Sequence, residues 1–338
     1  PRSFDLSQPA TATAASAGII QPWSSRTEGA FYDLYAAGAA YYPELLSQLA
    51  AAGVVRTDYR QTGGLVVSAD GAVLDDVEER LERRRSGPGE AMGRVQRLAG
   101  DRARDLFPPL AAGLDAVFVS GGGRVDGRTL RDGLLEAGCR RGGVVRTGHA
   151  ALEDAATVVV EGERLAADAV VIAGGAWTDA VLGDLGARVG VRPQRGQITH
   201  LRLEGVDTSA WPVLEPLASH YLVAFDEGRI VVGATREDGS GFDVRVTAAG
   251  QQQVLRDALS IAPGLADATL VETRVGLRPV TDGRLPVVGA VPGRPGLFVA
   301  TGYGAAGLTM GPVLGDAVAR AVGGEHVPLL DAVAPRTA

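Results

Sequence analysis

Apolar residues recur every three or four positions across residues 28–52, the spacing of one face of an α-helix. The apolar positions are Phe31, Leu34, Tyr35, Tyr42, Leu45, Leu46 and Leu49. Pro43 interrupts this pattern, and a proline inside a helix removes a backbone donor and clashes with the preceding turn. We therefore predict a long helix that Pro43 kinks or divides and that ends at Gly53.

Short apolar runs alternate with helical patterns through the middle of the chain. The predicted elements are a strand at 63–69, a helix at 75–85, a strand with a turn at 116–127, a helix at 129–142, a strand at 143–148, a hairpin beginning at 157–162, and a strand, glycine turn and helix at 166–186. In the helix at 129–142, Leu130, Leu134 and Leu135 are predicted to face the core. This alternation is typical of a mostly parallel α/β sheet.

Residues 190–275 follow a different pattern. Apolar runs at 198–203, 220–225 and 228–235 are joined by short turns, which predicts an antiparallel sheet. A helix is predicted after Thr247, a suitable N-cap, with Val254, Leu255, Ala258 and Leu259 on one face. The sequence thus predicts an α/β domain with an inserted antiparallel α+β domain.

The composition is that of an ordinary globular protein, with 46% hydrophobic and 22% charged residues among 338. The net charge of −7 argues against a nucleic-acid partner, which attracts basic surfaces. No apolar run reaches the length of a membrane span, and the first residues lack a signal pattern, so we expect a cytoplasmic protein. Cys139, the single cysteine, is expected to be buried, and the four histidines lack metal-ligand spacing, so we expect no metal site.

The motif Gly-x-Gly-x-x-Gly occupies residues 302–307, between an apolar run and a helical pattern that Gly323 closes. A dinucleotide fingerprint also needs a second strand that ends in an acid about 20 residues later. Asp331 lies near that distance, but the segment around it is short and contains a proline, which disfavours this interpretation. Two alternatives remain: a helix N-terminus that faces an electron-rich group, or a tight turn without a ligand.

Phe4 and Asp5 have the character of a strand end. If Asp5 is the acid of a dinucleotide fold, its phosphate loop is expected upstream of Pro1. The alternative is a solvated aspartate in a terminal tail.

Eight segments in a shared order resemble the FAD-dependent D-amino-acid oxidase superfamily, which includes glycine oxidase, D-amino-acid dehydrogenase and sarcosine oxidase. They are ATAASAGIIQP (12–22), GGRVDGRTLRDGLLEA (122–137), ADAVVIAGGAWTDAVL (167–182), RPQRGQI (192–198), VVGAT (231–235), GFDVRVT (241–247), VGLRPVTDGRLPVVG (275–289) and LFVATGYGAAGLTMGP (297–312). The resemblance implies a Rossmann-like FAD-binding domain of the glutathione-reductase type, formed by 1–55, 115–188 and 276–338, and a substrate domain formed by 56–114 and 189–275. The family's first strand and phosphate loop have no counterpart in the sequence.

The resemblance also implies the cofactor contacts. The glycine motif near the C-terminus is expected to face the flavin ring rather than the pyrophosphate, where a helix N-terminus stabilises the charge of the reduced ring. The residues implied to bind FAD are Asp5, Ala15, Ser16, Ala17, Gly18, Ala173, Gly174, Gly175, Trp177, Gly302, Tyr303, Gly304, Ala305, Ala306, Gly307, Leu308 and Thr309. Binding is expected to be non-covalent, because Cys139 does not match the position of covalent attachment in sarcosine oxidases.

The implied reaction is oxidation of a small amino acid or secondary amine by hydride transfer to flavin N5, with oxygen or a quinone as the final acceptor. Arg278 resembles the family arginine that binds the substrate carboxylate, and Tyr221 resembles a substrate-side tyrosine, although an ordinary strand aromatic fits Tyr221 equally well. No acidic or histidine base is evident in the sequence, which suits direct hydride transfer. Ala305 stands where glycine oxidases tend to have an arginine, so the last loop looks closer to D-amino-acid dehydrogenases.

The alternative function is a catalytically silent, truncated homologue or a non-enzymatic partner subunit, suggested by the missing phosphate loop. The substrate and the oligomeric state, with a homo-oligomer among the alternatives, are left open by the sequence.

Overall fold

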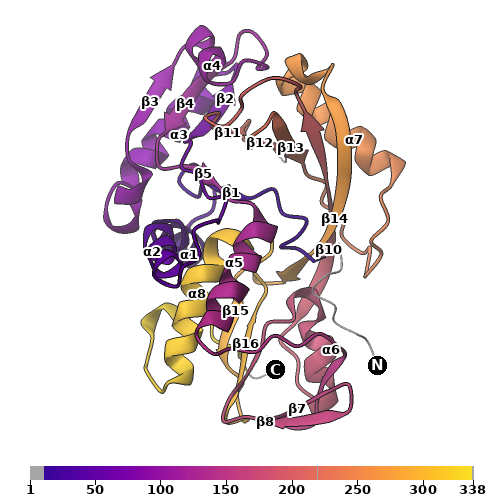
Figure 1. The fold of residues 1–338 in the computed structure, drawn as a ribbon. Coiled ribbons are helices and arrows are strands. Elements are labelled where there is room, and N and C mark those ends of the chain that lie inside the picture. Colours follow the sequence, from indigo (N-terminus) through magenta and orange to yellow (C-terminus); the bar gives the residue numbers. More distant parts are fainter. Residues whose placement is uncertain (1–10, 219, 337–338) are drawn as a thin grey trace.

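A computed structural model of the chain describes residues 11–218 and 220–336, and its largest element is an eight-stranded sheet (Figure 1). In spatial order its strands are β14 (Thr269–Thr281), β10 (Val191–Arg202), β13 (Arg229–Gly233), β12 (Tyr221–Ala224), β11 (Val213–Glu215), β2 (Gly64–Ser68), β4 (Asp115–Val119) and β3 (Val95–Leu98). Neighbouring strands are antiparallel except β11 and β2, which are parallel. The antiparallel second sheet expected from residues 190–275 is therefore confirmed.

Three smaller sheets accompany the large one. They are β15 (Val287–Ala290), β16 (Leu297–Thr301) and β9 (Val170–Ile172); β6 (Ala150–Leu152), β7 (Thr157–Val160) and β8 (Glu163–Ala166); and β1 (Ile19–Ile20) with β5 (Gly123–Arg124). In these described sheets β9 and β16 form a parallel ladder, while the short connections β15–β16 and β6–β7–β8 give antiparallel pairs. The α/β class is confirmed, but the sheet is less parallel than expected.

Helices cover the sheets and connect them. They are α1 (Gly29–Ala40), α2 (Tyr42–Ala51), α3 (Gly71–Arg83), α4 (Gly100–Leu106), α5 (Gly127–Arg140), α6 (Thr178–Leu182), α7 (Ala248–Ile261) and α8 (Gly307–Val322), with 3₁₀ turns at Gly87–Met92, Gly175–Trp177, Gly183–Leu185, Pro263–Leu265 and Pro328–Leu330. The division at Pro43 is confirmed, because this proline lies in the first turn of α2. Thr247 caps α7 as predicted, accepting a hydrogen bond from the amide of Gly250 at 3.1 Å.

Three local predictions are wrong: the strand at 143–148, the inward-facing leucines of α5 and the burial of Cys139. Residues 143–148 form no strand, and Val144 is 81% exposed, because no described strand lies beside this segment to pair with it. In α5, Leu130 is buried, but Leu134 and Leu135 are 41% and 37% exposed.

The buried positions of α5 are spaced by three and four residues at Leu130, Gly133 and Ala137. Spacing, rather than hydrophobicity alone, therefore decides which face of α5 is covered. Cys139 lies off this stripe and is exposed, so its predicted burial is also wrong.

One predicted domain boundary separates β4 from the strands it pairs with, and another falls inside β14. β4 begins at Asp115, the predicted start of a cofactor-binding segment, yet it pairs with β2 and β3 of the large sheet. β14 runs past the boundary at 276 toward the loop at 302–307. The division into two domains stays a prediction. Asp331 lies in a turn after the last 3₁₀ helix, which agrees with the rejection of a second nucleotide-binding strand.

The large sheet has two distinct faces. On one face, Leu65, Leu214 and Leu222 pack with Val254 and Ala258 of α7. Side chains alternate along a strand, so the neighbouring positions point the other way. On that opposite face, which we call the inner face, the residues that pack around Ala17 are Ile198, Val213, Val223, Val231 and Ala234. The inner face therefore meets the segment at 11–18.

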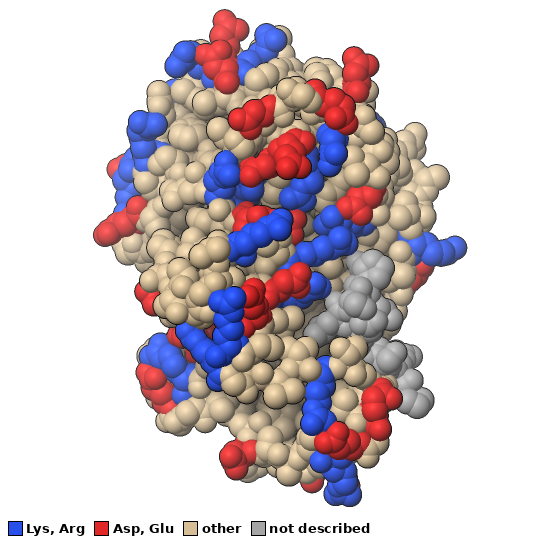
Figure 2. Space-filling model, in the orientation of Figure 1, with Lys and Arg blue, Asp and Glu red and all other residues tan. Residues whose placement is uncertain are grey.

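Arginine and acidic side chains are interspersed over the surface shown in Figure 2. No helix in the described part of the chain has the length and apolar character needed to cross a membrane.

The packing of α1 on α8 depends on Gly38. A Cβ atom at Gly38 would lie 2.3 Å from the carbonyl oxygen of Thr309, which is too close without moving the helices apart. We expect Gly38→Ala to lower the free energy of unfolding by about 1–3 kcal/mol through overpacking. Gly315→Ala is the matched control, since a Cβ atom there meets nothing within 4 Å on the same α8. This control is expected to gain about 0.5–1 kcal/mol from helix propensity. Denaturant titration measures both, and equal stabilities of the two variants would contradict the prediction.

Candidate active site

The loop at residues 302–307 connects β16 to α8, as the sequence predicts. Gly302 and Gly304 adopt positive φ angles of 79° and 55°, a conformation that glycine reaches without strain. The amide of Gly304 donates to the carbonyl oxygen of Pro279 at 2.8 Å, and a Cβ atom at Gly302 would lie 2.8 Å from Thr281 Cγ2. The loop therefore packs directly on the end of β14.

The first turn of α8 has no side-chain cap. Ala306 stands at the N-cap position, and the amides of Gly307 and Leu308 have no hydrogen-bond acceptor among the described residues. Farther into the turn, Thr309 Oγ1 donates to the carbonyl oxygen of Ile19 at 3.2 Å. Two free N–H donors and the positive end of the helix dipole favour an electron-rich group at this position.

The predicted flavin-side segment at 15–18 lies between β14 and the turn that precedes α5. A Cβ atom at Gly276 would lie 2.8 Å from Ala15 Cβ, and one at Gly18 would lie 1.9 Å from the carbonyl oxygen of Val125. Ser16 Oγ accepts from the amide of Gly18 at 3.3 Å. Both glycines permit contacts between backbone segments that a larger residue would prevent.

The turn at 173–177 follows β9, which runs parallel to β16, so it lies at the same C-terminal end of β16 as the 302–307 loop. Thr301 Oγ1 donates to the carbonyl oxygen of Gly175 at 2.8 Å, which ties this turn to the start of the 302–307 loop. The Trp177 ring packs against Phe242, with 5.3 Å between ring centroids. Ala173 is exposed and Gly174 is half-buried. The structure thus brings the predicted cofactor segments to the start of α8, apart from Asp5, which lies outside the described residues.

Arg278 projects from the inner face of β14. Its Nη1 donates to the carbonyl oxygen of Thr235 at 3.0 Å, with longer contacts to Gln194 Oε1 (3.4 Å) and the carbonyl oxygen of Arg195 (3.5 Å). No carboxylate of the described residues lies within ion-pair distance of its guanidinium. Burial lowers the pKa of Arg278 below its usual range. This half-buried cation therefore retains capacity for an anionic ligand.

Tyr221 lies beside Arg278. It pairs with Gly233 across β12 and β13, and a Cβ atom at Gly233 would lie 3.2 Å from the Tyr221 hydroxyl. Burial raises the pKa of Tyr221, while the adjacent charge of Arg278 and a hydrogen bond with it act in the opposite direction. The two residues predicted for substrate contact are therefore neighbours.

The structure adds Glu215 and Tyr35 to this region, which sequence reasoning missed. Glu215 shares the inner face with Val213, accepts a hydrogen bond from Ser24 Oγ at 2.8 Å, and has no cationic partner among the described residues. Burial raises the pKa of Glu215 to about 7. Tyr35 shares a hydrogen bond with Thr309, and burial followed by the charge of Glu215 raises the pKa of Tyr35.

The sequence around Tyr35 and Glu215 contains no pattern that marks either residue as part of a site. Tyr35 belongs to an apolar helical stripe and was indistinguishable from a core aromatic. Glu215 ends a strand of three residues, too short for its alternation to indicate a face. A third residue, Arg236, directly follows the recognised segment at 231–235, and its position after that segment was the available clue.

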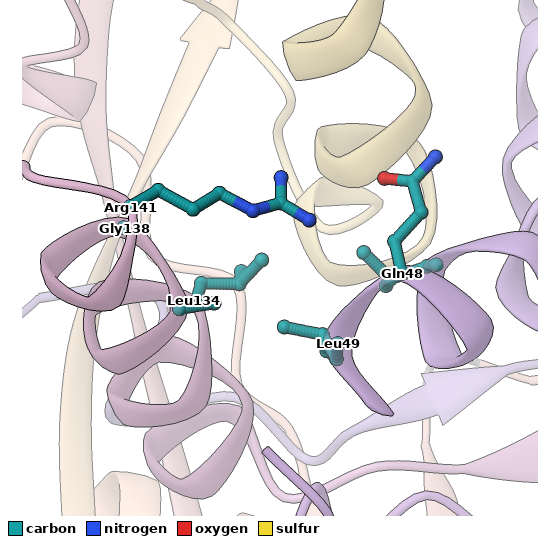
Figure 3. Close-up of a pocket in the computed structure, with 7 residues that line it drawn as sticks. Gln48, Leu49, Leu134, Gly138 and Arg141 are labelled. Atoms are coloured by element: carbon teal, nitrogen blue, oxygen red, sulfur yellow. The ribbon is translucent and has the colours of Figure 1, made fainter. Parts of the chain in front are cut away.

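A shallow pocket between α2 and α5 is separate from this region (Figure 3). Leu49 and Leu134 point toward each other across it, and Gln48 and Arg141 flank it (Figure 3). None of the predicted site residues lines this pocket, so the pocket is not part of the candidate site.

Comparison with known proteins identifies the class. The family model described as FAD dependent oxidoreductase matches residues 4–321. An uncharacterized oxidoreductase, YurR, of Bacillus subtilis (strain 168) is 45% identical over 332 residues, covering 96% of this chain and 89% of that protein. A glycine oxidase of Geobacillus kaustophilus is 31% identical over 236 residues, covering 67% of this chain and 61% of that protein.

The structural comparison agrees. Iminodiacetate oxidase (IdaA) from Chelativorans sp. BNC1 superposes with a TM-score of 0.93 at 44% identity, covering 97% of this chain and 90% of that chain. Glycine oxidase from Geobacillus kaustophilus gives a TM-score of 0.84 at 26% identity, over 98% of this chain and 91% of that chain. The chain belongs to the FAD-dependent oxidoreductase family that contains the D-amino-acid oxidases.

The residues at the start of α8 fit the cofactor of this family. The free amides of Gly307 and Leu308 offer donors for an electron-rich ring edge, and the small residues Gly304 and Ala305 leave the approach to them open.

The acid Glu215 and the buried His200 predict opposite pH effects on stability. Folded Glu215 keeps its proton up to a pKa of about 7, against 4.5 when unfolded, so its ionisation lowers the free energy of unfolding as pH rises between these values. Burial lowers the pKa of His200 from 6.5 to about 4, so stability is lost as pH falls through that window.

We expect Glu215→Gln to remove the first effect. The free energy of unfolding of this variant should then rise with pH between 4.5 and 7 more steeply than that of the wild type, by up to about 1.4 kcal/mol per pH unit. Denaturant titrations at several pH values measure the difference, and the exposed Glu204→Gln serves as the control. Parallel pH profiles for the wild type and Glu215→Gln would disprove the assignment.

Proposed function

We propose that the protein oxidises a small amino acid or secondary amine whose carboxylate docks on Arg278. One observation carries this proposal: the half-buried guanidinium has no acidic partner among the described residues and lies one residue from Pro279, to which the 302–307 loop is bonded. The group that binds substrate and the helix start that suits the cofactor are therefore adjacent. A planar guanidinium makes two parallel hydrogen bonds to a carboxylate, which fixes its orientation.

Tyr221 and Glu215 complete the substrate side. The Tyr221 hydroxyl lies next to Arg278 and is placed to donate to the same carboxylate. Glu215, whose pKa of about 7 lets it exist in both forms near neutral pH, holds or releases a proton on the same face of the sheet. We assign Glu215 the uptake of the proton that the substrate ammonium loses, which leaves the neutral amine that hydride transfer requires.

The proposed cofactor contacts are those that the sequence predicts. FAD supplies the hydride acceptor when it is bound. Gly307 and Leu308 would hold its electron-rich ring edge through their amides, and the segment at 15–18 would border the ring. Cys139 lies on α5, outside these contacts, which supports non-covalent binding. Oxygen or a quinone is the proposed final electron acceptor.

Arg278→Ala tests the docking role. We expect it to raise KM and to lower kcat/KM. The loss of transition-state stabilisation should be about 2–4 kcal/mol, because a charge-assisted bidentate contact is lost. Flavin content, read from the visible absorbance of the purified protein, should remain that of the wild type. Steady-state kinetics on a panel of amino acids and N-substituted glycines provides the measurement.

Arg104→Ala is the control for this experiment, since Arg104 is an exposed residue of α4 that forms no ion pair with any residue that the structure describes. An unchanged KM in Arg278→Ala would refute the docking role. A colourless wild-type protein that releases no flavin on denaturation would instead favour the catalytically silent alternative.

A further inference from the structure

Arg236 lies in a short segment that β10 holds firmly. The amides of Arg195 and Glu237 donate to each other's carbonyl oxygens at 3.2 and 3.0 Å. The amide of Thr235 donates to the carbonyl oxygen of Gln197 at 3.2 Å, and Gln197 returns a bond from its own amide to Thr235 Oγ1 at 2.9 Å. The backbone on both sides of Arg236 is therefore fixed against the same strand.

The side chains flanking Arg236 point toward α7. Glu237 accepts from Gln197 Nε2 at 2.7 Å and from Thr235 Oγ1 at 2.7 Å, and Gln197 Nε2 also donates to Thr247 Oγ1 at 2.9 Å, at the start of α7. Because side chains alternate along an extended segment, Arg236 points to the inner face.

The register places Arg236 beside the guanidinium of Arg278. Arg195 pairs with Glu237 in antiparallel orientation, so the residue across from Gly196 is Arg236. A Cβ atom at Gly196 would lie 2.5 Å from Arg278 Nη2, which shows that the Arg278 guanidinium covers Gly196 on the inner face. Arg236 thus lies across from the glycine that the Arg278 guanidinium covers.

The charge of Arg236 is uncompensated. Its side chain is exposed and makes no hydrogen bond or ion pair with any residue that the structure describes. Burial is the main influence on the pKa of both Arg278 and Tyr221, lowering the first and raising the second, and the charge of Arg236 acts on each in the lowering direction. Two neighbouring cations repel each other unless an anion lies between or beside them. If one substrate carboxylate binds Arg278, the charge of Arg236 still has no anionic partner.

We propose that Arg236 binds a second acidic group of the substrate, so that the site selects amines carrying two carboxylates. This inference rests on the proposed function, since it takes Arg278 as the dock of the first carboxylate. Arg278, the more buried of the two, holds the carboxylate next to the reacting carbon. Arg236, at the exposed rim, contacts the carboxylate borne by the nitrogen substituent. Arg236 is therefore a residue that determines specificity and takes no part in the transfer of hydride.

A pair of matched ligands tests the inference by binding. Diglycolate and methoxyacetate differ by one carboxylate, and both carry an ether oxygen in place of the amine nitrogen. We expect diglycolate to bind the FAD-loaded wild type about tenfold more tightly than methoxyacetate, as measured by calorimetry. Arg236→Gln should lose this factor for diglycolate and leave methoxyacetate unchanged. Arg104→Gln on α4 is the control and should retain the wild-type preference.

A second pair of compounds, both of them substrates, tests the same inference by enzyme turnover. The wild type should oxidise N-(carboxymethyl)alanine with a kcat/KM about tenfold above that for N-methylalanine, and Arg236→Gln should bring the two values together. Equal values in the wild type, or a preference that survives Arg236→Gln, would overturn the inference. If the FAD-loaded protein oxidised neither compound, the proposed function would fail, whereas a loss of diglycolate preference in Arg236→Gln would still support the second anion site.

Discussion

The hydrogen bond from the Gly304 amide to the carbonyl oxygen of Pro279 joins the two halves of the candidate site. It fastens the loop before α8 to the end of β14, one residue beyond Arg278. The helix start that offers free amides and the strand that offers a guanidinium are thereby held together. Any displacement of α8 along its axis would separate the free amides from the Arg278 guanidinium, so the packing of α1 on α8 through Gly38 also holds the candidate site together.

The two faces of the large sheet have different roles, one in the hydrophobic core and the other in the candidate site. The face toward α7 is an apolar core that anchors the strands. The inner face carries the polar positions, with Glu215 on β11, Tyr221 on β12 and Arg278 on β14. Small residues make this possible, because Gly196, Gly233 and Gly276 leave room where long side chains lie over the sheet or the segment at 11–18 crosses it. Polar groups are thus gathered without disturbing the core behind them.

Much of this could be predicted from the sequence. Periodicity predicted the split helix at Pro43 and the cap at Thr247, and motif order predicted the family. The roles of Arg278 and of the last glycine loop stay predictions. What failed depended on long-range pairing. Leu134 is apolar yet 41% exposed, because it borders the open pocket between α2 and α5 and is not packed into the core. Glu215 and Arg236 became neighbours of the site through strand register, which one sequence does not encode in any short pattern.

The exposed position of Cys139 has a practical consequence. It is the only thiol of the chain, and it lies on α5 outside the contacts of the candidate site. A maleimide-linked fluorophore would therefore attach at one defined place on the surface. Energy transfer from that dye to a bound yellow chromophore would then report cofactor release in real time, without altering any residue that touches substrate.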